Sequence, residues 1–138
     1  HVYRAIIEGI CLELYMSMKA MEKRGKMNIK EVFVGGGGSK SDLACQILAD
    51  VFNLPVKRIH THEACSIGAA MVAFVAKGEF DNYREAIKSM VHEKDVFMPI
   101  KENNKVYSGM YNMVYKKIYR HVKPLYATMN NLKERNML

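Results

Sequence analysis

Apolar residues recur along the chain at two spacings, and the alternation between them predicts the secondary structure. Segments with helical spacing of three and four residues are 2–24, 41–52, 63–76, 82–91 and about 103 onward. Short apolar or extended runs, typical of strands, are 31–34, 56–59 and 95–100. Gly78 and Asn82 are expected to cap helices, and Pro124 to interrupt or kink the last one. This order predicts an α/β fold, a short central sheet flanked by helices, with two parallel strands at its centre.

Four consecutive glycines join the first predicted strand to the next helix. Gly35 to Gly38 are followed by Ser39, Lys40 and Ser41. Glycine lets the backbone approach a phosphate closely because no Cβ intervenes, and the free amides of a first helical turn attract anions. A tight turn without a ligand is the alternative, but ordering four glycines has a large entropic cost. The pattern therefore favours a phosphate- or nucleotide-binding loop.

Two common phosphate-binding motifs do not fit this loop. The Walker motif requires glycine directly before the lysine, whereas Ser39 precedes Lys40. The dinucleotide pattern GxGxxG fails from both Gly35 and Gly36, and the following strand ends in Arg-Ile-His rather than in an acidic residue. Both standard motifs are therefore rejected for this loop.

Four short motifs occur in a fixed order along the chain. They are Val-Gly-Gly-Gly-Gly-Ser-Lys-Ser at 34–41, Gln-Ile-Leu-Ala-Asp at 46–50, Pro-Val at 55–56 and Glu-Ala-x-x-Ile-Gly-Ala-Ala at 63–70. This set, with Arg-Ala and Glu-Gly pairs in the first helix, resembles the C-terminal domain of the FGGY carbohydrate kinases. That family includes xylulokinases, ribulokinases, gluconokinases and glycerol kinases, and the resemblance extends over nearly the whole chain.

The resemblance implies a fold and an activity. Members of the family place two actin- or hexokinase-like (ribonuclease H-like) ATPase domains around a cleft, with sugar mainly on the first and ATP against the second. Residues 1–138 would then be the C-terminal, nucleotide-binding portion of an ATP-dependent sugar kinase whose N-terminal sugar-binding domain is absent. Residues 101–138 would form a basic helical tail. The implied cofactors are ATP and Mg²⁺, the partners ATP or ADP and a sugar or polyol, and the location the cytoplasm.

Site residues can be carried over by position. Gly36, Gly37 and Gly38 would form the backbone cradle for the nucleotide, with Gly37 nearest the phosphate. Ser41 would offer a hydroxyl where glycerol kinases have an asparagine, and Ser39 is a further nucleotide-binding candidate within the loop. The family's catalytic aspartate and Mg²⁺ carboxylates lie mostly before this segment, so no catalytic residue is predicted here. The segment alone is expected to lack catalysis.

The charge distribution leaves two other functions open. Of the net +7, most belongs to residues 101–138, which hold 8 Lys/Arg against 2 Asp/Glu. A tail of this kind could bind nucleic acid or an acidic partner, although such a face is more often simply solvated. A nucleotide sensor without transfer activity is the other alternative. The tyrosines that recur in the tail are expected to pack on a neighbouring element rather than to stack on bases, and they are at 107, 111, 115, 119 and 126.

The remaining candidate residues are expected to have structural roles. Cys11, Cys45 and Cys65 form no CxxC pair and are expected to be buried thiols in a reducing compartment. His60 and His62 lack a third ligand at clear spacing, so no metal site is predicted. The small residues 68–70 are expected to let their helix approach the glycine loop or the sheet. No apolar run reaches the roughly 18 residues of a membrane span, and apolar surface left by an absent domain could allow a homo-oligomer.

Overall fold

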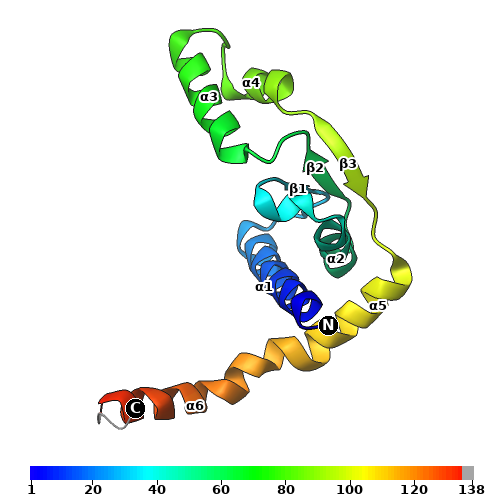
Figure 1. Cartoon of the computed structure of the whole chain (residues 1–138), viewed down its shortest axis with the longest axis vertical. Coiled ribbons are helices and arrows are strands. Elements are labelled where there is room, and N and C mark those ends of the chain that lie inside the picture. The colour runs from blue at the N-terminus through cyan, green and yellow to red at the C-terminus, as the bar shows by residue number, and fades with distance from the viewer. Residues whose placement is uncertain (135–138) are drawn as a thin grey trace.

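A computed structural model describes residues 1–134 and arranges them around a small sheet, from which a helical arm and a helical tail extend (Figure 1). The strands are β1 (Val32–Val34), β2 (Val56–Ile59) and β3 (Glu93–Phe97). The helices are α1 (Val2–Gly25), α2 (Asp42–Phe52), α3 (Ala64–Lys77), α4 (Tyr83–Met90), α5 (Lys101–Met110) and α6 (Lys116–Glu134). A 3₁₀ turn η1 (Gly37–Lys40) precedes α2, and a π-helical turn η2 (Tyr111–Tyr115) joins α5 to α6. The predicted α/β class is confirmed.

The sheet has the order β1-β2-β3, and its two pairings differ in direction. β1 and β2 are parallel, with Val34 opposite Arg58. The glycine loop and α2 connect them. The predicted parallel pairing is therefore confirmed, but β1 lies at one edge of the described sheet and only β2 is at its centre. β3 returns antiparallel on the other side of β2 and places Asp95 opposite Arg58. Both neighbours of Arg58 across the sheet thus come from segments distant in sequence.

The hydrophobic core surrounds α2. This helix is buried from Ile47 to Phe52, and α1 and α5 pack against it. α1 contributes four buried residues, Ile7, Cys11, Leu12 and Met18. Within the buried stretch of α2, Asp50 is only 1% exposed and accepts hydrogen bonds from the start of α5. Burial of α2 places its first turn, and the glycine loop before it, against the body of the molecule.

The tyrosines of the tail behave in two ways. Tyr107 and Tyr111 are buried in the core, and the Tyr115 hydroxyl donates a hydrogen bond of 2.8 Å to Glu13 of α1. For these three the predicted packing on a neighbouring element is confirmed. Tyr119 and Tyr126 are 67% and 55% exposed, so the same prediction is wrong for them. The reason is that α6 leads away from α1 and from the rest of the molecule (Figure 1).

The arm formed by α3 and α4 corrects two expectations. α3 packs against α4 rather than against the sheet, and a Cβ added at Gly68 would meet nothing within 4 Å. The small residues 68–70 therefore do not bring this helix against the glycine loop or the sheet in this chain. Cys65, in the first turn of α3, is exposed rather than buried. Both expectations fail because α3 leads away from the sheet (Figure 1).

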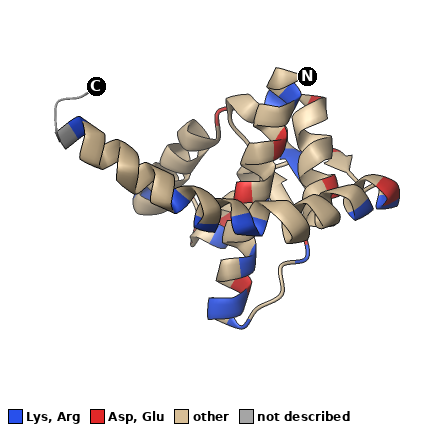
Figure 2. Cartoon of the chain, turned by 90° about the horizontal axis from the view of Figure 1, so that it is seen from below, with Lys and Arg blue, Asp and Glu red and all other residues tan. Residues whose placement is uncertain are grey.

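The tail is helical and basic, but its irregularity is not where the proline predicts it. Pro124 lies inside α6, which continues through it, whereas η2 interrupts the helix between α5 and α6. A single proline removes one helical hydrogen bond, and the helix is retained here. Figure 2 shows Lys and Arg spaced along α6. Residues 135–138 of the predicted tail lie outside the described residues. Among residues 1–134, no helix is long and apolar enough to cross a membrane.

Candidate functional site

The glycine loop begins with two residues that only glycine fits well. A Cβ at Gly35 would lie 3.0 Å from the Cβ of Ala64 and 3.1 Å from Cδ1 of Ile59, so a side chain there would crowd the start of α3 and the end of β2. Gly36 has φ of +81°, a left-handed value that L-residues with side chains rarely adopt. These two glycines turn the chain out of β1 and into η1.

Gly37 and Gly38 leave an open space in front of the loop. A Cβ at either position would meet nothing within 4 Å, and neither has a positive φ. Their amides donate no hydrogen bond to any residue among 1–134, whereas the amides of Ser39 and Ser41 donate to the carbonyls of Gly36 and Gly38 at 3.2 and 3.4 Å. Two residues whose amides have no partner among residues 1–134 therefore border a space that no side chain fills, a combination that suits anion binding.

The two serines of the predicted site are placed differently. Ser39 is buried, and its hydroxyl donates a 2.7 Å hydrogen bond to the carbonyl of Gly36. Nδ1 of His62 lies 3.3 Å from the hydroxyl oxygen of Ser39, within hydrogen-bond distance. Ser41 is the N-cap of α2, and its hydroxyl accepts from the amide of Ala44 at 3.3 Å. Ser39 thus orders the loop from within, whereas the Ser41 hydroxyl proton stays available to a ligand.

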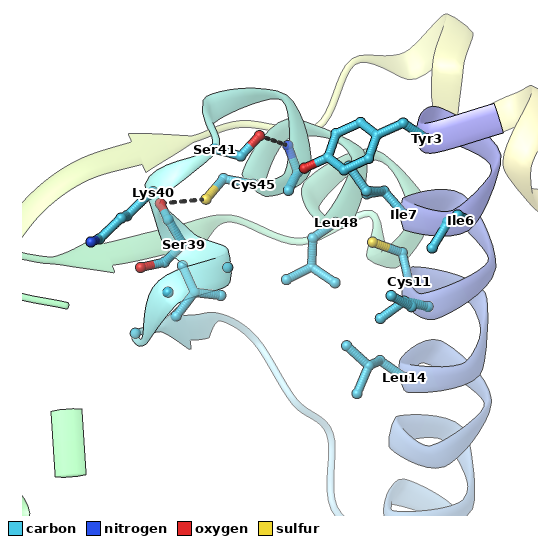
Figure 3. Close-up of a pocket in the computed structure, with 16 residues that line it drawn as sticks. Tyr3, Ile6, Ile7, Cys11, Leu14, Ser39, Lys40, Ser41, Cys45 and Leu48 are labelled. Atoms are coloured by element: carbon cyan, nitrogen blue, oxygen red, sulfur yellow. Dashed lines mark hydrogen bonds between the residues drawn. The ribbon is translucent and has the colours of Figure 1, made fainter. Parts of the chain in front are cut away.

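A cavity of about 630 Å³ lies between the loop and α1 (Figure 3). The loop supplies one wall, and Ala44, Cys45 and Leu48 of α2 continue it. The opposite wall is the apolar face of α1, made by Tyr3, Ile6, Ile7, Ile10, Cys11 and Leu14. This volume is within the range of small-molecule pockets, and polar donors at one end of an apolar slot are typical of them. A ligand with an anionic end and a flat apolar end matches both walls.

The electrostatics of the cavity are set by the loop. Burial raises the pKa of the Cys11 thiol to about 11, so this wall is neutral at physiological pH. Among the described residues that line the cavity, the charged types Lys, Arg, Asp and Glu are represented by Lys40 alone. Its side chain extends away from α1 (Figure 3). A nucleotide fits this set of groups because amides and apolar surface face it. Mg²⁺ does not, because the described lining contains no carboxylate.

Sequence reasoning missed one residue that supports the loop. Arg58 of β2 is buried, and its Nη1 donates a 2.9 Å hydrogen bond to the carbonyl of Ser39. The sequence does contain a signal for such a role: Arg58 lies within a predicted strand, and a cation in a buried strand must have polar partners. Which partners these are depends on strand pairing, which the sequence pattern does not show.

The predicted residues come together in the loop, and the metal candidates do not. Gly36, Gly37, Gly38, Ser39 and Ser41 all lie in the loop or at the head of α2. His60 pairs with His92 instead, their ring centroids being 5.3 Å apart. In the described part of the chain, no group of three His, Cys, Asp or Glu residues is arranged to hold a metal.

Comparison with known proteins gives matches over most of the chain. Residues 1–77 match the sequence model described as "FGGY family of carbohydrate kinases, C-terminal domain". The uncharacterized sugar kinase YgcE of Escherichia coli is 39% identical over 87% of this chain and 24% of its own length. A xylulose kinase of Staphylococcus epidermidis is 36% identical over 91% of this chain and 25% of its own length. The chain spans about a quarter of the length of these curated relatives.

A solved structure matches the fold. The ligand-bound xylulose kinase from Lactobacillus acidophilus superposes with a TM-score of 0.77 and 23% identity, over 91% of this chain and 25% of that one. The match extends beyond residue 77, since it covers more of the chain than the family model does. The expected fold, that of the actin/hexokinase-like ATPase domain of these kinases, is confirmed.

Proposed function

Because this chain belongs to the FGGY family of carbohydrate kinases, we propose that it forms the C-terminal, nucleotide-binding part of an ATP-dependent sugar kinase. The complete enzyme would transfer the terminal phosphoryl group of ATP to a hydroxyl of a sugar or polyol, in the cytoplasm. The names of the relatives, sugar kinase and xylulose kinase, support this class of acceptor. The observation that carries the proposal is the pair of unused amides, at Gly37 and Gly38, at one end of an apolar cavity.

Each loop residue has a defined part in this proposal. Gly36 makes the left-handed turn that aims η1 at the cavity. Gly37 and Gly38 donate their amides to a phosphate of ATP, and Ser41 donates its hydroxyl from the head of α2. Ser39 contributes by holding the loop closed through its bond to the carbonyl of Gly36. The nucleoside would lie along the apolar face of α1, where its flat base is removed from water.

The segment contributes binding and orientation rather than the proton transfer. Phosphoryl transfer needs a base for the acceptor hydroxyl and Mg²⁺ to neutralise the phosphates. The cavity lining described above offers neither a base nor a carboxylate. We therefore propose that those groups, and the sugar site, belong to the part of the kinase that this chain does not contain. Residues 1–138 alone would then bind nucleotide without turnover.

The test compares two glycine-to-alanine substitutions in the full-length protein. Gly37→Ala places a methyl group in the space proposed for phosphate, and Gly68→Ala places one on α3, where the space is equally open. ADP release is measured against a panel of pentuloses, polyols and aldonates. We expect Gly37→Ala to raise the KM for ATP at least about tenfold, a loss of about 1.4 kcal/mol of binding, with the acceptor KM unchanged. Gly68→Ala should leave both constants unchanged.

Two results would contradict the proposal. If Gly37→Ala leaves the KM for ATP at the Gly68→Ala value, the loop does not hold the phosphate. If the protein binds ATP but releases no ADP with any acceptor, transfer activity is refuted and a nucleotide sensor is favoured instead.

A further inference from the structure

The glycine loop is held from behind by a buried cation. Arg58 lies on β2, and its side chain is 9% exposed. Its Nη1 donates to the carbonyl of Ser39 at 2.9 Å and to Oδ1 of Asp42 at 2.7 Å, and its Nε donates to Oδ2 of Asp95 at 2.7 Å. Its guanidinium also lies over the ring of Phe97, 5.3 Å from the centroid. One side chain therefore joins the loop, the head of α2 and β3.

The contact with Ser39 bears directly on the shape of the loop. Ser39 is the third residue of η1, and its carbonyl also accepts from the thiol of Cys45 at 3.5 Å. With that peptide held by two donors, the turn that carries Gly37 and Gly38 cannot rotate freely. Arg58 itself does not line the cavity. Any effect that it has on a ligand must pass through the loop.

Arg58 also offsets a negative charge close to the cradle. Asp42 is the first residue of α2, three residues after Ser39, and its side chain is 76% exposed. An exposed carboxylate at this position would repel a phosphate at the loop. The guanidinium beside it reduces that repulsion, and it does so with the same Nη1 that holds the loop.

We infer that Arg58 is a positioning residue for nucleotide binding, which fixes the Ser39 peptide and neutralises Asp42 so that the amides of Gly37 and Gly38 face the phosphate. The inference rests on the proposed function of the loop. A planar guanidinium can hold a carbonyl and two carboxylates at once, whereas an ammonium is a single point. Arg58→Lys should therefore restore only part of the effect.

Lys57, the preceding residue of β2, is a matched control. Its Nζ lies 2.7 Å from Glu31 and 2.8 Å from Glu93, so it also bridges two carboxylates across the sheet. It also lies over an aromatic ring, that of Phe33 at 5.4 Å. It has no hydrogen bond to the glycine loop. Replacing either residue by methionine removes one cation and two ion pairs, but only one replacement releases the loop.

The experiment measures steady-state kinetics of the full-length protein with ATP and with its acceptor. Arg58→Met should raise the KM for ATP about tenfold or more, the loss expected when a charge-assisted hydrogen bond is removed, with the acceptor KM unchanged. Arg58→Lys should give an intermediate value, and Lys57→Met a change below about twofold. A melting curve of each variant separates loss of fold from loss of binding. Asp42 and Asp95 are both partly exposed, so their carboxylates regain water in Arg58→Met.

Several outcomes would overturn the inference. An equal rise of the KM for ATP in Arg58→Met and Lys57→Met would show that the sheet, not the loop, is affected. Equal rises of the KM for ATP and for the acceptor would indicate a structural role. If Arg58→Met does not fold, Arg58→Lys provides the test, and a wild-type KM for ATP in that variant would overturn the inference. Gly37→Ala separates the two proposals: loss of ATP affinity there with none in Arg58→Met refutes only the inference, whereas no loss in either refutes the proposed function as well.

Discussion

Replacing Asp50 should weaken the attachment of α5 to α2. This carboxylate is 1% exposed and accepts three hydrogen bonds: from Nε2 of Gln46 at 2.9 Å, the amide of Ile100 at 2.8 Å and Nδ2 of Asn103 at 2.7 Å. Ile100 precedes α5 and has no side-chain cap of its own. Asp50 therefore takes the place of a cap, supplied by α2 from 50 residues away in sequence.

The structure indicates how much each substitution should destabilise. Asp50→Ala removes all three acceptors, and because the side chains of Gln46 and Asn103 can turn to water, the amide of Ile100 bears most of the loss. We expect the free energy of unfolding to fall by about 3 kcal/mol, near the upper end for one buried donor left unpaired plus a lost cap. Asp50→Asn keeps an oxygen for Ile100 but sets an amide against the amide of Asn103. Its cost should be about 1–2 kcal/mol.

The decisive variant exchanges the two residues. In the double substitution Asp50→Asn with Asn103→Asp, the amide and the carboxylate change places, so the hydrogen bond between them is restored with its direction reversed. Asn103→Asp alone brings two carboxylates together and should destabilise the protein. Urea unfolding followed by circular dichroism gives the four free energies of the cycle. We expect the double variant to lose less free energy of unfolding than the two single variants lose together, by at least about 1 kcal/mol. Strict additivity would refute the direct pairing of these two side chains.

Two further predictions test burial and charge. Cys65 is exposed, whereas Cys11 is buried and its pKa is raised to about 11. Iodoacetamide at pH 8 should therefore label Cys65 first and Cys11 only on unfolding, which peptide mass spectrometry measures. Equal labelling rates would contradict the burial of Cys11. Burial raises the pKa of Glu8, but hydrogen bonds from Arg4 and Tyr107 outweigh it and leave that pKa below its ordinary value of 4.5. The stabilisation is therefore present above pH 4.5 and lost as the pH falls through the lower folded-state pKa, so unfolding measured from pH 5 to 3 should depend less on pH in Glu8→Gln than in the wild type.

Much of the fold follows from local pattern. The spacing of apolar residues predicts β2 at 56–59, where it is found, and predicts a helix from 41 that is found at Asp42–Phe52. Asn82 is predicted to cap the start of α4 and Gly78 the end of α3, and both predictions are confirmed. These features succeed because they depend on interactions within about four residues of the chain. The same kind of reasoning misplaced the interruption of the tail, since it considered Pro124 alone and not the packing that accompanies η2.

The candidate site divides in the same way. The run of glycines is visible in the sequence, and so is its likeness to a kinase loop. The separate roles of the glycines are not visible in the sequence: Gly35 is crowded by Ala64 and Ile59, and Gly36 has a positive φ. Gly37 and Gly38 combine open space with an ordinary φ. The apolar face of α1 could be recognised as amphipathic, but not as the second wall of a cavity. The expected packing of the small residues near Gly68 failed because it depended on where α3 points.

By itself, therefore, the sequence determined the order of helices and strands, the glycine loop and the kinase family, all of which are encoded in neighbouring residues. Only the tertiary structure decided that Arg58 reaches the carbonyl of Ser39, 19 residues earlier, and that Asp50 holds Asn103, 53 residues later. Such pairs depend on how strands register and helices cross. A hydrogen bond requires its two atoms to lie about 3 Å apart, and no periodicity of residue types specifies a distance between segments that meet only after the chain has folded.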